Sequence, residues 1–406
     1  MESLSIVDVP PYFLCPISLE IMKDPVTLST GITYDRDSIE RWLFSDNNST
    51  CPVTKQPISD FSADITTPNH TLRRLIQSWC AANASNDIER FPTPKPPVDR
   101  SRISTLLDDA SNPSTRPNAL RELRSIAAES ERNRRCMESA GAGDALVSIM
   151  KRETVIEETL LCLLHDLQLS TRGMRDVLRR HADLIEVLAR VMLAKRASDQ
   201  CRARAVVLLR SAVAAANPNQ LMSAREVFEA VVGVIRDRIS AQATKVGLKV
   251  LGELCAWGRN RVRAVEAGAV DVLVGIVMEA GEIEGRRVVE MGLVVLDILC
   301  GCAEGRAEFV GNAAGLAAVG KRVLRLSNVA TERGVRILSS IARFSGTKAV
   351  LQEMAEVGVV AKLCLVLQVS CDVKTKEKAR EILRLHGRVW RNSPCIAPYL
   401  LSSYPN

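Results

Sequence analysis

An internal repeat constrains the fold of this chain more than any other feature of its sequence. From about residue 102 to residue 391, amphipathic helical patterns follow one another with few strand signals, and glycines fall between them. One apolar motif recurs in steps of 42, 43, 42, 47 and 43 residues, at Leu146, Leu188, Val231, Leu273, Gly320 and Leu363. A period of about 40–47 residues is typical of a solenoid with two or three helices in each repeat.

The turns between these helices narrow the type of solenoid. Several repeats open on a glycine turn, as at Gly141, Gly268 and Gly358, and we expect a long third helix to follow each turn. This pattern predicts an all-α, armadillo-type superhelical solenoid over residues 101–391. The repeat at Gly320 is the weakest match, because it has the longest step and a poor helix former at the key position.

Such a solenoid predicts a protein-binding surface rather than a reaction site. Stacked repeats bury a continuous core and leave an extended concave groove. His165, His181 and His386 are isolated on helical patterns. The pair Cys300 and Cys302 cannot complete a tetrahedral metal site without further ligands.

The rest of the chain divides into segments of different composition. We expect a short lead over residues 1–9, a compact unit over 10–82 and a tail over 392–406. Four prolines exclude a continuous helix from the linker, residues 83–100.

Two Cys-Pro loops mark the compact unit. They read like the loops of a zinc cross-brace, in which two tetrahedral zinc ions need about eight Cys or His ligands. Residues 1–82 offer only Cys15, Cys51, Cys80 and His70. The loops must therefore be held by something other than metal.

Further motifs accompany the loops: Cys15-Pro16-Ile17-Ser18, Asp24-Pro25-Val26, Gly31-Ile32-Thr33-Tyr34-Asp35-Arg36, Ile39-Glu40-Arg41-Trp42-Leu43, Cys51-Pro52-Val53-Thr54 and Pro68-Asn69-His70-Thr71-Leu72-Arg73-Arg74-Leu75-Ile76. With its missing zinc ligands, this segment resembles the U-box of plant E3 ubiquitin ligases. The resemblance implies a small α+β, zinc-free, RING-like module with the structural residues Cys15, Asp24, Tyr34, Asp35, Arg36 and Cys51.

The resemblance also implies an E3 ubiquitin ligase with no cofactor, no metal and no covalent enzyme–ubiquitin intermediate. The U-box would dock a ubiquitin-charged E2 while the solenoid groove holds the substrate, which makes the transfer effectively intramolecular. Lys55 stands where many such ligases place an arginine that bridges E2 and ubiquitin, and it lacks the planar guanidinium fork. The E2-binding residues on the U-box pattern are Ile17, Leu19, Trp42 and Pro52.

Short-range signals outline the U-box fold. Strands are expected over 26–28 and 32–34, around a turn at Gly31. A helix capped by Asp35 follows, and a final helix begins after the N-cap Asn69. The apolar stripe of this final helix is Leu72, Leu75, Ile76 and Trp79.

Two roles are open for Trp42. It shares one helix face with Ile39 and Leu43, so it either fills the core or contacts E2. The sequence favours the E2 contact, because the other two residues already supply the core face.

In place of zinc, polar contacts and a small aliphatic core are expected to tie the loops. The polar residues are Glu20, Lys23, Asp24, Asp35, Arg36 and Asp37, with the hydroxyls of Ser18 and Thr54. The core residues are Leu14, Ile21, Val26, Ile32 and Leu43.

The net charge of +7 hides an asymmetry. Residues 1–82 hold six basic and ten acidic side chains, a net charge of −4, so the remainder carries +11. This division suggests two different partners. The twelve cysteines lie at irregular intervals and no signal segment or long apolar run is evident, so we expect reduced thiols and no membrane span.

Three functional classes follow. The first is the ubiquitin ligase, and the resemblance places it in plant stress or immune signalling, in the cytoplasm, with nuclear or peripheral membrane locations as alternatives. The second is a non-catalytic armadillo adaptor or scaffold that binds an acidic partner. The third, binding of nucleic acid or an anionic membrane by the +11 segment, is the least expected. The U-box motifs favour the first, and self-association is left open.

Overall fold

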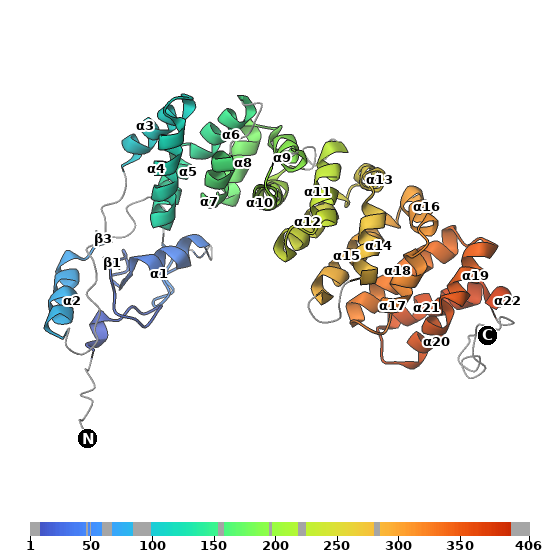
Figure 1. Cartoon of the computed structure of the whole chain (residues 1–406). Coiled ribbons are helices and arrows are strands. Elements are labelled where there is room, and N and C mark those ends of the chain that lie inside the picture. Colours follow the sequence, from blue (N-terminus) through green and yellow to red (C-terminus); the bar gives the residue numbers. More distant parts are fainter. Residues whose placement is uncertain are drawn as a thin grey trace, which may run out of the picture. The chain divides into compact units, whose positions relative to one another are not determined.

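The computed structural model describes residues 9–45, 48, 50–58, 67–83, 99–152, 158–194, 197–217, 225–279 and 285–390 (Figure 1). Internal contacts divide the chain into two compact units, Met1–Ala142 with Asp166–Gln168, and Gly143–His165 with Leu169–Asn406. The predicted tail, and almost all of the predicted lead and linker, lie outside the described residues.

The N-terminal part contains a small antiparallel sheet with the strand order β2-β1-β3. Strand β1 (Pro25–Thr27) pairs with β2 (Thr33–Asp35), and Val26 lies opposite Tyr34. The two-residue strand β3 (Thr67–Pro68) pairs with the other edge of β1. The two predicted strands are confirmed, with bounds shifted by one residue.

The conformation of the turn between these strands favours a glycine. Gly31 has a φ of 80°, which favours glycine, and its N–H donates to the carbonyl of Leu28 at 2.9 Å. The hydroxyls of Thr27 and Thr33 lie 2.9 Å apart across the hairpin. The predicted turn is therefore confirmed.

Helical elements accompany the sheet in this part of the chain. They are η1 (Pro11–Phe13), α1 (Arg36–Glu40), the π-helical segment η2 (Arg41–Ser45) and α2 (His70–Ala82). Helix α1 contacts β2, and α2 contacts β1. The prediction that Asp35 caps the first helix is only partly right. Asp35 occupies the N-cap position of α1, but its side chain makes no cap hydrogen bond and instead accepts the backbone N–H groups of Lys23 and Asp24.

Helix α2 closes the hydrophobic core. The Asn69 side chain accepts the N–H of Leu72 at 3.0 Å, which confirms the predicted N-cap. Leu75 is wrong as a core residue, because it is 53% exposed and the buried face of α2 consists of Ile76 and Cys80. The core cluster is Phe13, Cys15, Met22, Val26, Leu28, Tyr34, Ile39, Leu43, Cys51, Ile58, Ile76 and Cys80, whereas the predicted core residues Leu14, Ile21 and Ile32 are only half-buried.

From residue 99 onward, the described elements are helices. One set of helices consists of α4 (Arg116–Glu129), α7 (Glu158–Asp166), α10 (Asp199–Ala215), α12 (Ala241–Leu254), α15 (Arg286–Leu299), α18 (Asn328–Phe344) and α21 (Val373–Leu385). A second set consists of α6 (Ala142–Arg152), α9 (Leu184–Leu193), α11 (Arg225–Asp237), α14 (Ala269–Glu279), α17 (Gly315–Arg322) and α20 (Val359–Gln368), and left-handed glycines precede α6, α14 and α20. The remaining helices are α3 (Arg100–Ser111), α5 (Glu131–Ser139), α8 (Thr171–Arg180), α13 (Gly258–Glu266), α16 (Ala303–Gly311), α19 (Lys348–Glu356) and α22 (Gly387–Trp390).

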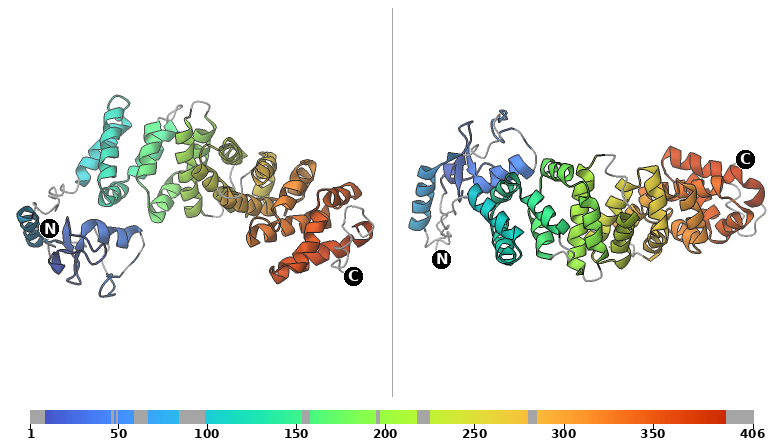
Figure 2. Two further views of the ribbon diagram at one scale, coloured as in Figure 1. Left: turned by 60° about the horizontal axis from the view of Figure 1, so that its bottom comes forward. Right: turned by 90° about the horizontal axis from the view of Figure 1, so that it is seen from above.

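Within the second unit, the helices stack in two layers (Figure 2). Helices α10, α12, α15, α18 and α21 each contact the next and form one layer. Helices α9, α11, α14, α17 and α20 form the other. This two-layer stack is the armadillo-type solenoid that the repeat predicts.

The prediction of a long helix after each glycine turn is wrong. The helices α14 and α20 after the glycine turns have 11 and 10 residues, whereas α10 and α18 in the other layer have 17 each. Buried residues lie on several sides of α14 and α20, so these helices are rich in apolar residues although they are short.

The predicted repeat register is confirmed. All six motif positions are buried, and Gly141, Gly268 and Gly358 have φ values of 85°, 79° and 76°. Gly320 marks a close approach of two helices, because a Cβ atom there would lie 2.9 Å from Cγ2 of Val359. The poor helix former at this position is thus a packing requirement.

Candidate functional site

The two Cys-Pro loops have the same backbone structure. In loop 1 (Cys15–Glu20) and loop 2 (Cys51–Gln56), the N–H of the first residue donates to the carbonyl of the last, at 2.8 and 2.9 Å. The N–H of the fifth residue donates back to the first carbonyl, at 2.8 and 2.9 Å. These fifth residues, Leu19 and Lys55, both adopt left-handed backbones with φ of 60° and 58°. Each loop is therefore a closed turn that presents its tip.

The cysteine sulfurs anchor both loops to strand β2. The Sγ of Cys15 accepts the backbone N–H of Asp35 at 3.3 Å. The Sγ of Cys51 lies 3.0 Å from the hydroxyl of Tyr34 and accepts the hydroxyl of Thr30 at 3.4 Å. Two consecutive residues of one strand thus hold the two loops where a cross-brace would use metal.

Burial and hydrogen bonds shift the pKa values of Tyr34 and Cys51 in opposite directions. Burial raises the pKa of Tyr34 well above its usual value, and its hydrogen bond to Cys51 raises it further. Burial also raises the pKa of the Cys51 thiol, but hydrogen bonds from Thr30, Thr54 and Tyr34 outweigh it and lower this pKa to about 6. The phenol oxygen of Tyr34 also accepts the N–H of Val53 at 3.3 Å, so the same side chain contacts two residues of loop 2.

Carboxylates brace the segment between loop 1 and β1. The Asp35 carboxylate accepts the N–H groups of Lys23 at 2.7 Å and Asp24 at 2.9 Å. Burial raises the pKa of Asp35 to about 6, and the hydrogen bond from Lys23 opposes this rise. The Asp24 carboxylate pairs with Nε of Arg36 at 2.7 Å and with the guanidinium of Arg73 on α2. These partly buried pairs link the residue just before β1 to helices α1 and α2.

The predicted polar network differs in its members. Asp24, Asp35 and Arg36 take part through their side chains, and the hydroxyls of Ser18 and Thr54 accept N–H groups within their own loops at 3.4 Å. Tyr34, predicted as structural, bridges β2 to loop 2. Arg73 and Thr30 were missed, because nothing local in the sequence signals such distant pairs.

Metal dependence provides a direct test of this bracing. In the described part of the chain, no three His, Cys, Asp or Glu side chains are placed to hold a metal ion. A structural zinc ion would contribute an apparent binding free energy of about 10–16 kcal/mol. We expect prolonged treatment with 1,10-phenanthroline to leave thermal unfolding unchanged. Unfolding by the chelator, or stoichiometric zinc in the purified protein, would contradict this expectation.

The predicted E2-binding residues lie on the two loops and on η2. Leu19 at the tip of loop 1 is 74% exposed, and Ile17 and Pro52 are partly exposed. Val53 on loop 2, which the sequence analysis did not include, is 53% exposed. Apolar side chains on rigid loop tips are a common feature of protein-docking surfaces.

Trp42 connects this surface to the core. Its ring packs partly buried against the core cluster, and its indole N–H donates to the carbonyl of Thr50 at 2.9 Å. The ammonium group of Lys55 lies 5.8 Å from the centroid of the ring. Trp42 is therefore neither fully buried nor free, and the structure brings it together with Lys55.

The solenoid carries a separate apolar hollow. It has a volume of about 450 Å³ and lies across α12, α15 and α18. Its apolar lining includes Leu248, Met291, Val294, Ile298 and Val329, and Lys249, Glu253, Arg287 and Glu290 also line it. Such a groove on the layer of long helices suits a peptide with an apolar side chain.

The metal-free loops and the stacked helices define a U-box followed by an armadillo-repeat solenoid. Family models match both parts, the U-box domain over residues 9–85 and the Plant U-box protein ARM repeat region over residues 102–406. The chain therefore belongs to the plant U-box proteins with armadillo repeats.

Curated relatives agree over the full length of the chain. It is 49% identical to "E3 ubiquitin-protein ligase PUB23" and 44% identical to "E3 ubiquitin-protein ligase PUB22", both from Arabidopsis thaliana. These matches cover 98% of this chain and 98% and 99% of the relatives. The crystal structure of Uso1-2 has a TM-score of 0.55 at 16% identity and covers 70% of this chain and 50% of that one, which shows a shared fold alone. Among the described helices, none is long and apolar enough to cross a bilayer.

Proposed function

We propose that this chain is an E3 ubiquitin ligase that docks a ubiquitin-charged E2 on its U-box and promotes direct transfer of ubiquitin to a lysine of a bound protein. The docking surface consists of Ile17, Leu19, Trp42 and Pro52, to which we add Val53. The substrate is held on the armadillo solenoid, and the setting is plant stress or immune signalling in the cytoplasm.

The observation that carries this proposal is the presentation of apolar loop tips by a rigid frame. Leu19 and Val53 are exposed, and the closed turns beneath them are fixed to β2 and to the core. A surface that is held in place before binding loses less conformational entropy on association. E2 docking then raises the effective concentration of the thioester near the substrate.

Burial of the U-box cysteines favours transfer without a covalent enzyme intermediate. Cys15 and Cys51 are fully buried and Cys80 is 2% exposed. The sulfurs of Cys15 and Cys51 are also engaged as hydrogen-bond acceptors. A low pKa makes Cys51 a better nucleophile in principle, but a buried sulfur cannot reach a thioester on another protein.

The test is reconstitution with E1, a panel of E2 enzymes, ubiquitin and ATP. We expect ubiquitin conjugates on the ligase itself with at least one E2, and faster discharge of charged E2 to free lysine. No thioester between ubiquitin and a cysteine of the ligase, recognised by its cleavage with a thiol reductant, should form during discharge. Inactivity with every E2 would favour the alternative function of a non-catalytic adaptor, which is otherwise supported only by the basic charge of the solenoid segment.

Lys55 is the candidate for polarising the thioester. Its left-handed backbone and its position above Trp42 hold the ammonium group beside the proposed E2 surface. We expect Lys55→Ala to slow single-turnover discharge about tenfold while E2 affinity changes little. Lys55→Arg should retain or increase the rate, because arginine adds a planar fork of donors. An unchanged discharge rate in Lys55→Ala would remove this role.

The substrate surface can be tested without knowledge of the substrate. Proximity labelling with a Trp42-inactivated chain should enrich proteins that the intact ligase would destroy. Adding Met291→Lys, which places a charge in the apolar hollow of α12, α15 and α18, should reduce that enrichment. Identical labelling by both chains would place the substrate elsewhere.

A further inference from the structure

An exposed aromatic ring at the end of α18 is flanked by two guanidinium groups. Phe344 is 64% exposed, although a phenyl ring loses favourable free energy when it faces water. The Cζ atoms of Arg306 and Arg343 lie 4.9 and 5.6 Å from its ring centroid. Cation–π contacts of this kind hold the ring without covering it.

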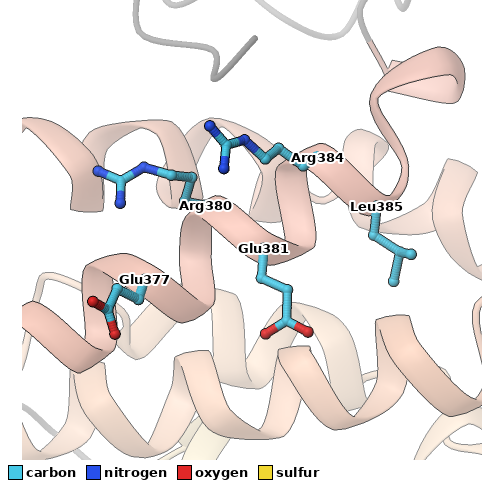
Figure 3. Close-up of a pocket in the computed structure, with 5 residues that line it drawn as sticks. All are labelled: Glu377, Arg380, Glu381, Arg384 and Leu385. Atoms are coloured by element: carbon cyan, nitrogen blue, oxygen red, sulfur yellow. The ribbon is translucent and has the colours of Figure 1, made fainter.

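The neighbouring helix α21 extends this surface. Arg343 pairs with Glu381 at 3.5 Å, which links the ring to α21. Figure 3 shows Arg380 and Arg384 pointing to one side of α21, while Glu381 and Leu385 point to the other. With Glu377, these four residues line an open hollow of about 530 Å³, and Leu385 is 54% exposed. Phe344, Arg306, Arg343, Arg380, Arg384 and Leu385 are called the Phe344 patch below.

Helix α21, which contributes Arg380, Arg384 and Leu385 to the Phe344 patch, has more basic than acidic residues. Helix α21 carries the basic residues Lys374, Lys376, Lys378, Arg380 and Arg384 against the acidic residues Glu377 and Glu381. Glu381 is already paired with Arg343, and Arg380 has no ion pair among the described residues. A ligand with carboxylates would therefore be attracted to this surface.

We propose that the Phe344 patch binds an acidic peptide segment that carries an aromatic or large aliphatic side chain. The apolar side chain packs on Phe344 and Leu385, while carboxylates pair with the surrounding arginines. A phosphate group alone would use the cations and leave both apolar side chains uncovered. The chain's own residues 391–406 contain no Asp or Glu, so they do not complement the charge.

This inference goes beyond the proposed ubiquitin transfer, because the Phe344 patch lies on α16, α18 and α21 rather than on the U-box. The test uses the full chain and a fluorescent peptide of about twelve residues that alternates glutamate with leucine around one phenylalanine. Two control peptides replace every glutamate with lysine, or every apolar residue with serine. We expect anisotropy to report binding of the first peptide alone, and binding should weaken as salt rises.

Variants locate the binding site. Phe344→Ser and the charge reversal Arg380→Glu should each weaken binding about tenfold. Arg179→Ala on α8, whose side chain is 68% exposed, should not change it. Ubiquitin discharge from E2 should be equal in all these chains, so loss of peptide binding is distinguished from loss of ligase activity.

Several results would overturn the inference. One is that either control peptide binds as tightly as the first peptide. Another is that the Arg380→Glu variant and the Phe344→Ser variant both bind the first peptide with unchanged affinity. A tenfold gain in affinity on deletion of residues 392–406 would show that the chain's own tail occupies the surface. Circular dichroism checks the fold of each variant, and Arg380→Glu alone decides the question if Phe344→Ser unfolds.

Discussion

Trp42→Ala should abolish most ubiquitin ligation while the chain remains folded. Aromatic residues at the centre of protein interfaces contribute about 2 kcal/mol or more on truncation, which is about 30-fold in affinity. Trp42 also supports loop 2 through its hydrogen bond to Thr50 and lies beneath Lys55, so its loss affects both docking and transfer. We expect a large fall in single-turnover discharge of charged E2 and a right-shifted E2 titration.

Two controls separate docking from folding. Trp42→Phe retains an apolar ring but not the indole N–H bond to Thr50, and we expect an intermediate loss. Trp79 lies on α2, and its ring packs edge-on against Phe13 with 5.8 Å between the centroids; Trp79→Ala removes this contact. If the Trp42 variant loses its fold as readily as the Trp79 variant, Trp42 is a core residue. If its discharge rate is unchanged, the docking surface is elsewhere.

The solenoid could be predicted because its determinants are local and repeated. Each motif position, such as Leu146 or Leu273, is buried by helices close in sequence, and its period is visible without tertiary information. The glycine turns could also be predicted, because left-handed backbone positions such as those at Gly268 and Gly358 are usually occupied by glycine. The reason for Gly320 was not visible, since it is a contact with Val359 in the following repeat.

The U-box was harder to predict in detail because long-range pairs replace its metal. Local patterns indicated the hairpin and the N-cap Asn69, but not that the Asp35 carboxylate turns back to Lys23 and Asp24. The similarity of the two loops was visible as Cys-Pro-Ile-Ser and Cys-Pro-Val-Thr. Their shared left-handed fifth residue was not, because leucine and lysine do not signal that conformation.

The ion pairs of Asp24 give the second large effect that we expect. Asp24→Ala leaves the guanidinium groups of Arg36 and Arg73 without their shared carboxylate, and both are largely buried, with side chains 12% and 15% exposed. Removal of one partner from a buried charge pair costs about 3 kcal/mol or more. Hydrogen exchange measured by mass spectrometry should show faster exchange throughout residues 9–82, with solenoid peptides unchanged.

Asp37→Ala is the matched control, since it removes the same charge from an exposed position on α1. A surface substitution of this kind should change stability by no more than about 0.5 kcal/mol. The double variant Asp24→Ala with Arg73→Leu should recover part of the lost protection, because it no longer buries that unpaired guanidinium. Equal protection in the Asp24 and Asp37 variants would show that the ion pairs do not take the place of zinc, and that the sulfur contacts of Tyr34 and Asp35 stabilise the loops by themselves.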